Sequence, residues 1–169
     1  MRIVPAGPEH FAAVLALNEE SVSVLAPLTR GRLEALHRRA DDHRVAVVEG
    51  IAVGFLLAFT DGADHDSPNF RWFAERGAGF VYIDRVVVAP WCRRAGVGSQ
   101  LYRDLIAFAV EQGRSRVTCE IDADPPNPAS EQFHDAFGLV EVGTQWVEYE
   151  PGHPKCVSLR ELSVTDARA

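Results

Sequence analysis

VVVAPWCRRAGVGSQLY, residues 86–102, joins an apolar, β-branched run to a helical pattern through a turn with two arginines and two glycines. Apolar residues recur at helical spacing from Val97 to Phe108, and residues 78–90 have the composition of a strand that stops at its proline. The first turn of a helix has unpaired N–H groups, and the helix dipole favours an anion there. The stretch therefore predicts a phosphate or pyrophosphate site.

Two phosphate-binding motifs compete for this turn, and both match it weakly. A Walker A loop ends in Gly-Lys-Ser or Gly-Lys-Thr, whereas this chain has Gly98, Ser99 and Gln100. A dinucleotide fingerprint needs a glycine or alanine three positions after Gly98, where Leu101 stands.

The chain before this stretch predicts two helices and a hairpin. Residues 7–22 and 29–40 show helical patterns, with Thr29 as a candidate cap of the second helix. Residues 43–60 form two β-branched runs around a Glu-Gly turn, which indicates an antiparallel hairpin. Residues 61–77 are rich in Asp, Gly, Ser and Pro, so we expect a long loop there.

The chain after this stretch predicts a strand, a turn, a short helix and a closing pair of strands. These elements fall at residues 115–122, 124–128, 129–137, 139–150 and 155–162. No repeat and no linker divides the sequence, so we expect one mixed α/β domain over residues 1–169.

Composition narrows the class of protein further. The 169 residues carry a formal net charge of -7, which argues against nucleic-acid binding. No apolar run is long enough to span a membrane, and the N-terminal residues MRIVPAGPEHF contain no long apolar region of the kind a secretory signal needs, so we expect a cytoplasmic protein without a membrane partner. The three cysteines, Cys92, Cys119 and Cys156, lie far apart without a CxxC pair, so we expect free thiols and no metal.

Two segments resemble the GCN5-related N-acetyltransferases (GNATs). RRAGVG is similar to the family's pyrophosphate loop, whose pattern is Gln or Arg, two residues, Gly, one residue, then Gly or Ala; Arg93, Gly96 and Gly98 match. NPASEQFHDAFGL resembles the family's asparagine-initiated segment, with Asn127 and Gly138 in the matching positions. Together with the hairpin and the terminal strands, the resemblance covers nearly the whole chain, and it is closest to a subgroup of predicted acetyltransferases without a known substrate.

The resemblance implies a mixed, mostly antiparallel sheet of about seven strands flanked by helices, in which one splayed strand binds the pantetheine arm of acetyl-CoA. It also allows for a homodimer, because the family often pairs through its terminal strands. The cofactor-binding residues that it implies are Val86, Val87, Val88, Arg93, Arg94, Ala95, Gly96, Val97, Gly98, Ser99 and Asn127.

Acetyl transfer to a primary amine needs a base for the amine and an acid for the leaving thiolate. His134 stands where the family usually has a tyrosine, so we take it as the candidate acid, with packing or substrate binding as the alternative. Asp84 and Glu120 lie mid-strand, where an acid is costly unless it is paired or used, so either is a candidate base or one half of an ion pair. Cys92 inside the turn leaves a covalent acyl-cysteine route open, and His65 reads as solvated in a polar turn.

The acceptor is expected to be an amine, either a small molecule or a peptide N-terminus, that reacts directly in a ternary complex. The residues expected to contact it are Asn18, Glu19, Trp72 and Phe73. Two other functions stay open: a CoA-binding regulatory domain without catalysis, and an acyltransferase for a longer acyl-CoA.

Overall fold

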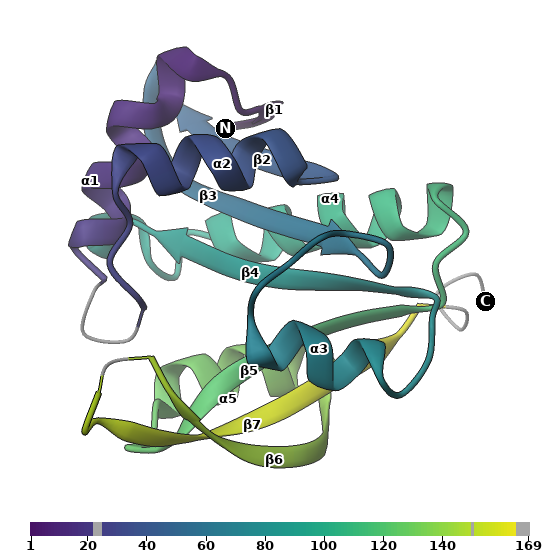
Figure 1. Cartoon of the computed structure of the whole chain (residues 1–169). Coiled ribbons are helices and arrows are strands. Elements are labelled where there is room, and N and C mark those ends of the chain that lie inside the picture. The colour runs from purple at the N-terminus through teal and green to yellow at the C-terminus, as the bar shows by residue number, and fades with distance from the viewer. Residues whose placement is uncertain (22–24, 150, 165–169) are drawn as a thin grey trace.

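The computed structural model describes residues 1–21, 25–149 and 151–164. Figure 1 shows the arrangement of its elements. In chain order they are β1 (Arg2–Pro5), the 3-10 turn η1 (Pro8–His10), α1 (Phe11–Glu19), α2 (Arg30–Arg39), β2 (Asp42–Val48), β3 (Ile51–Thr60), α3 (Pro68–Ala74), β4 (Phe80–Val88), the 3-10 turn η2 (Pro90–Cys92), α4 (Val97–Glu111), β5 (Arg116–Asp124), α5 (Pro128–Ala136), β6 (Val140–Glu148) and β7 (Pro154–Ser163).

The described strands form one sheet of seven, in the order β1-β2-β3-β4-β5-β7-β6. Every neighbouring pair is antiparallel except β4 and β5, which run parallel. In Figure 1, α2 and α3 lie in front of the sheet, and α4 and α5 lie behind it. The expected mixed, mostly antiparallel sheet flanked by helices is therefore confirmed.

Local signals in the N-terminal half act as the sequence predicts. Thr29 caps α2, because its Oγ1 accepts the N–H of Arg32 at 3.2 Å. Glu49 and Gly50 turn the β2–β3 hairpin at positive φ angles of 51° and 82°. Within the described residues, no helix is both long and apolar enough to span a membrane.

The expected loop at residues 61–77 is wrong in part, because it contains α3. Ser67 caps this helix through its Oγ, and Pro68 occupies the first helical position, which is a regular way for a helix to begin. Phe70 and Phe73, three residues apart, are both buried in a second, aromatic cluster of the core. The polar composition of residues 61–77 gave no indication of α3, which is anchored to the core by the side chains of Phe70 and Phe73.

The parallel pair β4–β5 is short, and this is the decisive feature of the sheet. Its register runs only from Phe80 opposite Arg116 to Tyr82 opposite Thr118, after which the two strands diverge toward the left of Figure 1. At the closed end, Asp61 accepts the N–H of Gly79 and the guanidinium of Arg114, each at 2.5 Å. These contacts hold the two strands together at one end and leave the other end open.

A substitution of Gly54 on β3 tests how tightly β3 packs on β4. A Cβ there would lie 2.7 Å from the carbonyl oxygen of Val87 and 3.2 Å from Val97 Cγ1, so the strands would have to shift. Gly54→Ala should destabilise the fold by ~1–3 kcal/mol, measured by urea denaturation. Gly31→Ala in α2, where nothing lies within 4 Å, is the control and should stabilise by ~0.5–1 kcal/mol. Equal midpoints for both variants would contradict the close packing.

Candidate active site

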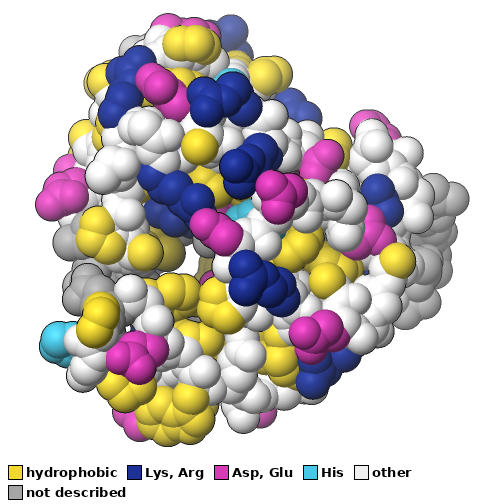
Figure 2. Space-filling model, viewed as in Figure 1, with side chains coloured by type: hydrophobic (Ala, Val, Ile, Leu, Met, Phe, Trp, Pro, Cys, Tyr) yellow, Lys and Arg dark blue, Asp and Glu magenta, His cyan; other side chains and the backbone are white. Residues whose placement is uncertain are grey.

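A cleft of about 1040 Å³ opens where β4 and β5 diverge. Figure 2 shows its mouth as the hollow between the upper and lower parts of the molecule. One end is lined by the second half of β4, the glycine turn and α5, and the other end by Tyr82, Asp84, Glu120 and residues before α2 and α3. The cleft thus joins a possible cofactor end to a set of ionisable side chains.

At the first end, the backbone of β4 is free on one side. The N–H of Ala89 donates to Val53 O at 2.9 Å, toward β3. Because alternate residues of a strand direct their backbone groups to opposite neighbours, Val86 and Val88 direct theirs toward β5, whose pairing has already ended. Val87 lines the cleft but directs its backbone to β3, so only two of the three valines offer main-chain partners.

The glycine turn presents the amides of a helix start. The first bond of α4 runs from the Gln100 N–H to Gly96 O at 3.0 Å, so the N–H groups of Val97 to Ser99 precede the helical bonding. Arg93 and Ala95 are different, because their N–H groups donate to Pro90 O and Cys92 O within the turn. The amide cradle is therefore shorter than the sequence predicts, and Ala95 does not line the cleft.

The two glycines serve different purposes. Gly96 has a φ of 79°, a conformation that other residues adopt at a cost. A Cβ on Gly98 would lie 3.2 Å from the ring of Phe133, so this glycine lets α4 approach α5 closely. The side chains of Arg93 and Arg94 are exposed and form no ion pair with a described residue, which leaves both cations available to an anion. These features fit a pyrophosphate group.

Helix α5 is fixed by Asn127, whose side chain accepts the Ser130 N–H at 3.2 Å. This cap places His134 against α4, where the Tyr102 hydroxyl lies 2.7 Å from His134 Nε2. His134 Nδ1 lies 2.6 Å from Ser130 O, and since a carbonyl only accepts, Nδ1 carries the proton and Nε2 accepts from Tyr102.

The expectation that His134 is the general acid needs correction. Both of its ring nitrogens are engaged, and burial lowers the pKa of the imidazole, so the side chain is neutral and has no proton to give to the cleft. The contact that the structure shows for Nε2 is the one with the Tyr102 hydroxyl.

Asp84 is the acid of the cleft whose two carboxylate oxygens both have a close partner. One oxygen lies 3.0 Å from His65 Nε2, and the other accepts from Arg85 Nε at 2.8 Å. Burial alone would raise the pKa of this carboxyl, but His65 and Arg85 outweigh it and hold the pKa at about 2. His65 itself is buried, not solvated as its polar surroundings predict. A carboxylate with so low a proton affinity is a structural anchor and a poor base.

Glu120 is the opposite case. Its Oε1 accepts the Tyr82 hydroxyl at 3.0 Å, whereas Oε2 is buried without a hydrogen-bond partner among the described residues. Burial raises the pKa of Glu120 to about 7, although Asn69 and Tyr82 both act to lower it. The Asn69 amide donates one hydrogen to the Tyr149 hydroxyl at 2.6 Å, and its second hydrogen remains available to the Glu120 carboxyl. Glu120 has the proton affinity of a general base near neutral pH and an oxygen without a hydrogen-bond partner among the described residues.

Comparisons with known proteins agree with this geometry. Residues 13–139 match the sequence model described as the Acetyltransferase (GNAT) family. The chain belongs to the GNAT acetyltransferase family. A comparison with curated protein sequences gave no match.

Solved GNAT structures share the whole fold. Ard1 from Thermoplasma volcanium is 20% identical with a TM-score of 0.77, and the match covers 96% of each chain. Ribosomal-protein-alanine N-acetyltransferase from Brucella melitensis is 24% identical with a TM-score of 0.72 over 96% of this chain and 99% of that one. YncA from Salmonella typhimurium, solved with its cofactor acetyl-CoA, is 20% identical with a TM-score of 0.73 over 97% and 94%. At these identities the likeness shows the fold alone.

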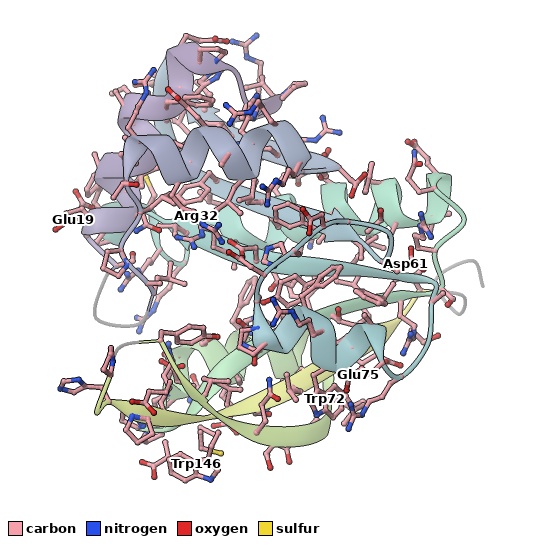
Figure 3. The ribbon with its side chains drawn as sticks, in the orientation of Figure 1. Glu19, Arg32, Asp61, Trp72, Glu75 and Trp146 are labelled. Carbon is pink, nitrogen blue, oxygen red and sulfur yellow. The ribbon has the colours of Figure 1, made fainter. Side chains whose placement is uncertain are left out.

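The four residues expected to contact the acceptor do not line the cleft of this GNAT protein. Asn18 is buried and accepts from Arg85 at 2.8 Å, and Phe73 belongs to the aromatic core. Figure 3 shows Glu19 at the outer side of α1 and Trp72 below α3. Trp72 packs over Gly143 of β6. Helical spacing put Asn18 on the core side of α1, but the residues that wall the cleft come from the segment after that helix.

Sequence reasoning missed four residues that line the cleft: Ser67, Tyr82, Tyr102 and Tyr149. A single signal was readable, because Ser67 precedes a proline in a helix-start pattern. The tyrosines look like ordinary core residues, and only the contacts of their hydroxyls distinguish them. Among residues 1–21, 25–149 and 151–164 no group of three His, Cys, Asp or Glu side chains is placed to hold a metal ion.

The pH dependence of stability tests the assignment of Glu120. Its raised pKa means that it favours folding fully below pH ~4.3, and that this contribution is lost as the pH rises through about 7. Glu120→Gln lacks this loss, so its stability relative to the wild type should rise by about 3 kcal/mol between about pH 4 and about pH 8, measured by denaturant unfolding. Glu111→Gln, at the exposed end of α4, controls for net charge. An equal difference in unfolding free energy between Glu120→Gln and the wild type at both pH values would contradict a buried Glu120 with a raised pKa.

Proposed function

We propose that this GNAT protein transfers the acetyl group of acetyl-CoA to a primary amine, directly in a ternary complex, with Glu120 as the general base. The observation that carries the proposal is the unpartnered Glu120 Oε2 in the same cleft as the free backbone of β4.

The cofactor end fits the two polar parts of acetyl-CoA. The free groups of Val86 and Val88 suit the amides of a pantetheine arm, and the amides of Val97 to Ser99 with Arg93 and Arg94 suit a pyrophosphate. When bound, acetyl-CoA supplies the acetyl thioester. The Val86 N–H is the donor that this chain offers to the oxygen on which negative charge develops.

At the acceptor end, Glu120 removes the amine proton. With a pKa of about 7 the carboxyl is ionised in about half of the molecules at neutral pH, and it is a far stronger base than Asp84 with a pKa of about 2. The first proton passes from the amine nitrogen to Oε2, and the nitrogen keeps the electron pair that would form the new bond to the acetyl carbon. The thioester C–S bond would then break, and the leaving sulfur would take up the second proton that the amine nitrogen loses.

The acceptor is proposed to be an amine that is cationic when free. Four carboxyl groups line this end of the cleft, those of Glu20, Asp66, Asp84 and Glu120. They face two guanidinium groups: Arg32, paired with Asp66 at 2.5 Å, and Arg85, paired with Asp84 at 2.8 Å. Figure 3 shows Arg32 on the side of α2 that faces β4. A net negative lining favours a cation over an acidic amino acid.

Binding of acetyl-CoA tests the cofactor end. Gly96→Glu should raise the acetyl-CoA Kd about tenfold or more, because a like charge near the pyrophosphate costs ~1–4 kcal/mol. Gly50→Glu is the matched control: its φ of 82° carries the same backbone cost, and it lies in the β2–β3 turn. Calorimetric titration measures both. Equal affinities, or no binding by the wild type, would reject this cofactor site.

Turnover tests the base. CoA release should depend on an amine found by screening, and Glu120→Gln should lower kcat by about 10²-fold or more. Asp122→Asn, on the same face of β5 and paired with Lys155 at 2.6 Å, is the control and should keep most activity. Acetyl-CoA binding without turnover of any amine would favour a CoA-binding regulatory domain, and turnover with a longer acyl-CoA alone would change the donor.

A further inference from the structure

Glu120 is held from one side by a chain of two hydroxyl groups. Tyr82 Oη lies 3.0 Å from Glu120 Oε1, and Ser67 Oγ lies 3.2 Å from Tyr82 Oη. The three residues come from β5, β4 and the start of α3, so the chain exists only because these elements meet beside the cleft.

The direction of the chain follows from the cap of α3. Ser67 Oγ accepts the N–H groups of Asn69 at 3.1 Å and Phe70 at 3.4 Å, which occupies both of its lone pairs. Ser67 therefore cannot accept from Tyr82, so its hydroxyl hydrogen is donated to Tyr82 Oη. Tyr82 in turn donates to the carboxylate, so both hydroxyls donate toward Glu120.

Tyr82 is a hydrogen-bond donor near neutral pH because burial favours its neutral hydroxyl. Its side chain is fully buried in the aromatic cluster, with ring centroids 5.6 Å from both His65 and Phe70, and burial raises its pKa well above the usual value. The packing also fixes the position of the hydroxyl, since the ring is enclosed on several sides.

We propose that Tyr82 and Ser67 are positioning residues for acetyl transfer: their two hydroxyls, donating in series, hold Glu120 Oε1, keep the carboxylate ionised and leave Oε2 to the acceptor amine. The inference rests on the proposed role of Glu120 as the base. A buried carboxylate without donors would be protonated and could not accept the amine proton.

Other groups near Glu120 also act on its charge. Asp84 is negative and raises the proton affinity of Glu120, which opposes ionisation. Asp122 is neutralised by Lys155. Asn69 donates one hydrogen to Tyr149 and, like Tyr82, lowers the pKa of Glu120 as a hydrogen-bond donor. The other ionisable side chains whose pKa responds to the charge of Glu120 are Tyr82, Tyr102, Cys119 and Tyr149.

The test is an infrared pH titration of the whole protein, which follows the C=O band of protonated carboxyl groups and needs no acceptor. The band that Glu120→Gln removes belongs to Glu120. Its midpoint should lie at about 7 in the wild type and rise by about one to two pH units in Tyr82→Phe, because a hydrogen bond to a charged group is lost. Phenylalanine keeps the ring, so the core keeps its packing.

Ser67→Ala is the second variant and should move the midpoint less, in the same direction, because it acts through Tyr82. Ser67→Thr keeps both the cap and the hydroxyl and should restore the wild-type midpoint. An unchanged midpoint in Tyr82→Phe would overturn the inference, as would a shift in Ser67→Thr equal to that in Ser67→Ala.

The titration separates this inference from the proposed function. If the midpoint shifts as expected but no amine is acetylated, the hydroxyl chain stands as a tuner of Glu120 and the transferase proposal fails. If amine acetylation depends on Glu120 but Tyr82→Phe titrates like the wild type, the transferase proposal stands and the positioning role fails.

Discussion

The short parallel pairing of β4 with β5 is the constraint on which the rest of the site depends. Two strands that stay paired satisfy each other's backbone groups, but these two separate after Tyr82 and Thr118. From that point Val86 and Val88 have no strand partner on one side, and a polar ligand becomes the natural partner. The cleft, its free amides and the placement of Glu120 beside them all follow from this divergence.

The divergence persists because both ends of the opening are braced. At the closed end, Asp61 holds Gly79 and Arg114 across the loop that enters β4. On the far side of the cleft, Arg160 of β7 bonds Asp135 and Glu131 of α5, which ties that helix to the lower strands. The strands can part without the sheet coming apart, because each half is fastened to its own helices.

The two acids of the cleft show how the same residue type is given opposite properties. Asp84 and Glu120 are both removed from water, and burial acts on both in the same direction. Arg85 and His65 lower the pKa of Asp84 by more than burial raises it. Glu120 has only neutral donors, Tyr82 and Asn69, which offset burial in part, so its pKa stays raised at about 7. The difference in pKa between the two carboxyl groups therefore comes from the side chains that surround each of them more than from how deeply each is buried.

How much of this could be foreseen depends on whether a feature is local. The Thr29 cap, the Glu49-Gly50 turn and the glycine turn before α4 are set by neighbours in the chain, and each was predictable. His134 and Trp72 were not, because their roles depend on Tyr102 of α4 and Gly143 of β6, residues that are remote in sequence. The prediction for His65 was wrong for the same reason: the polar sequence around it does not indicate that Asp84 lies 3.0 Å from its ring.

By itself, the sequence determined the family, the order of strands and helices apart from α3, and the glycine turn at Gly96 and Gly98, since periodicity, capping and glycine conformation act over a few residues. Tertiary structure alone decided which of the two acids has the raised pKa, which histidine is hydrogen-bonded at both ring nitrogens and which tyrosine donates to Glu120. Proton affinity and hydrogen-bond direction depend on partners brought together from separate elements, and no local pattern records those partners.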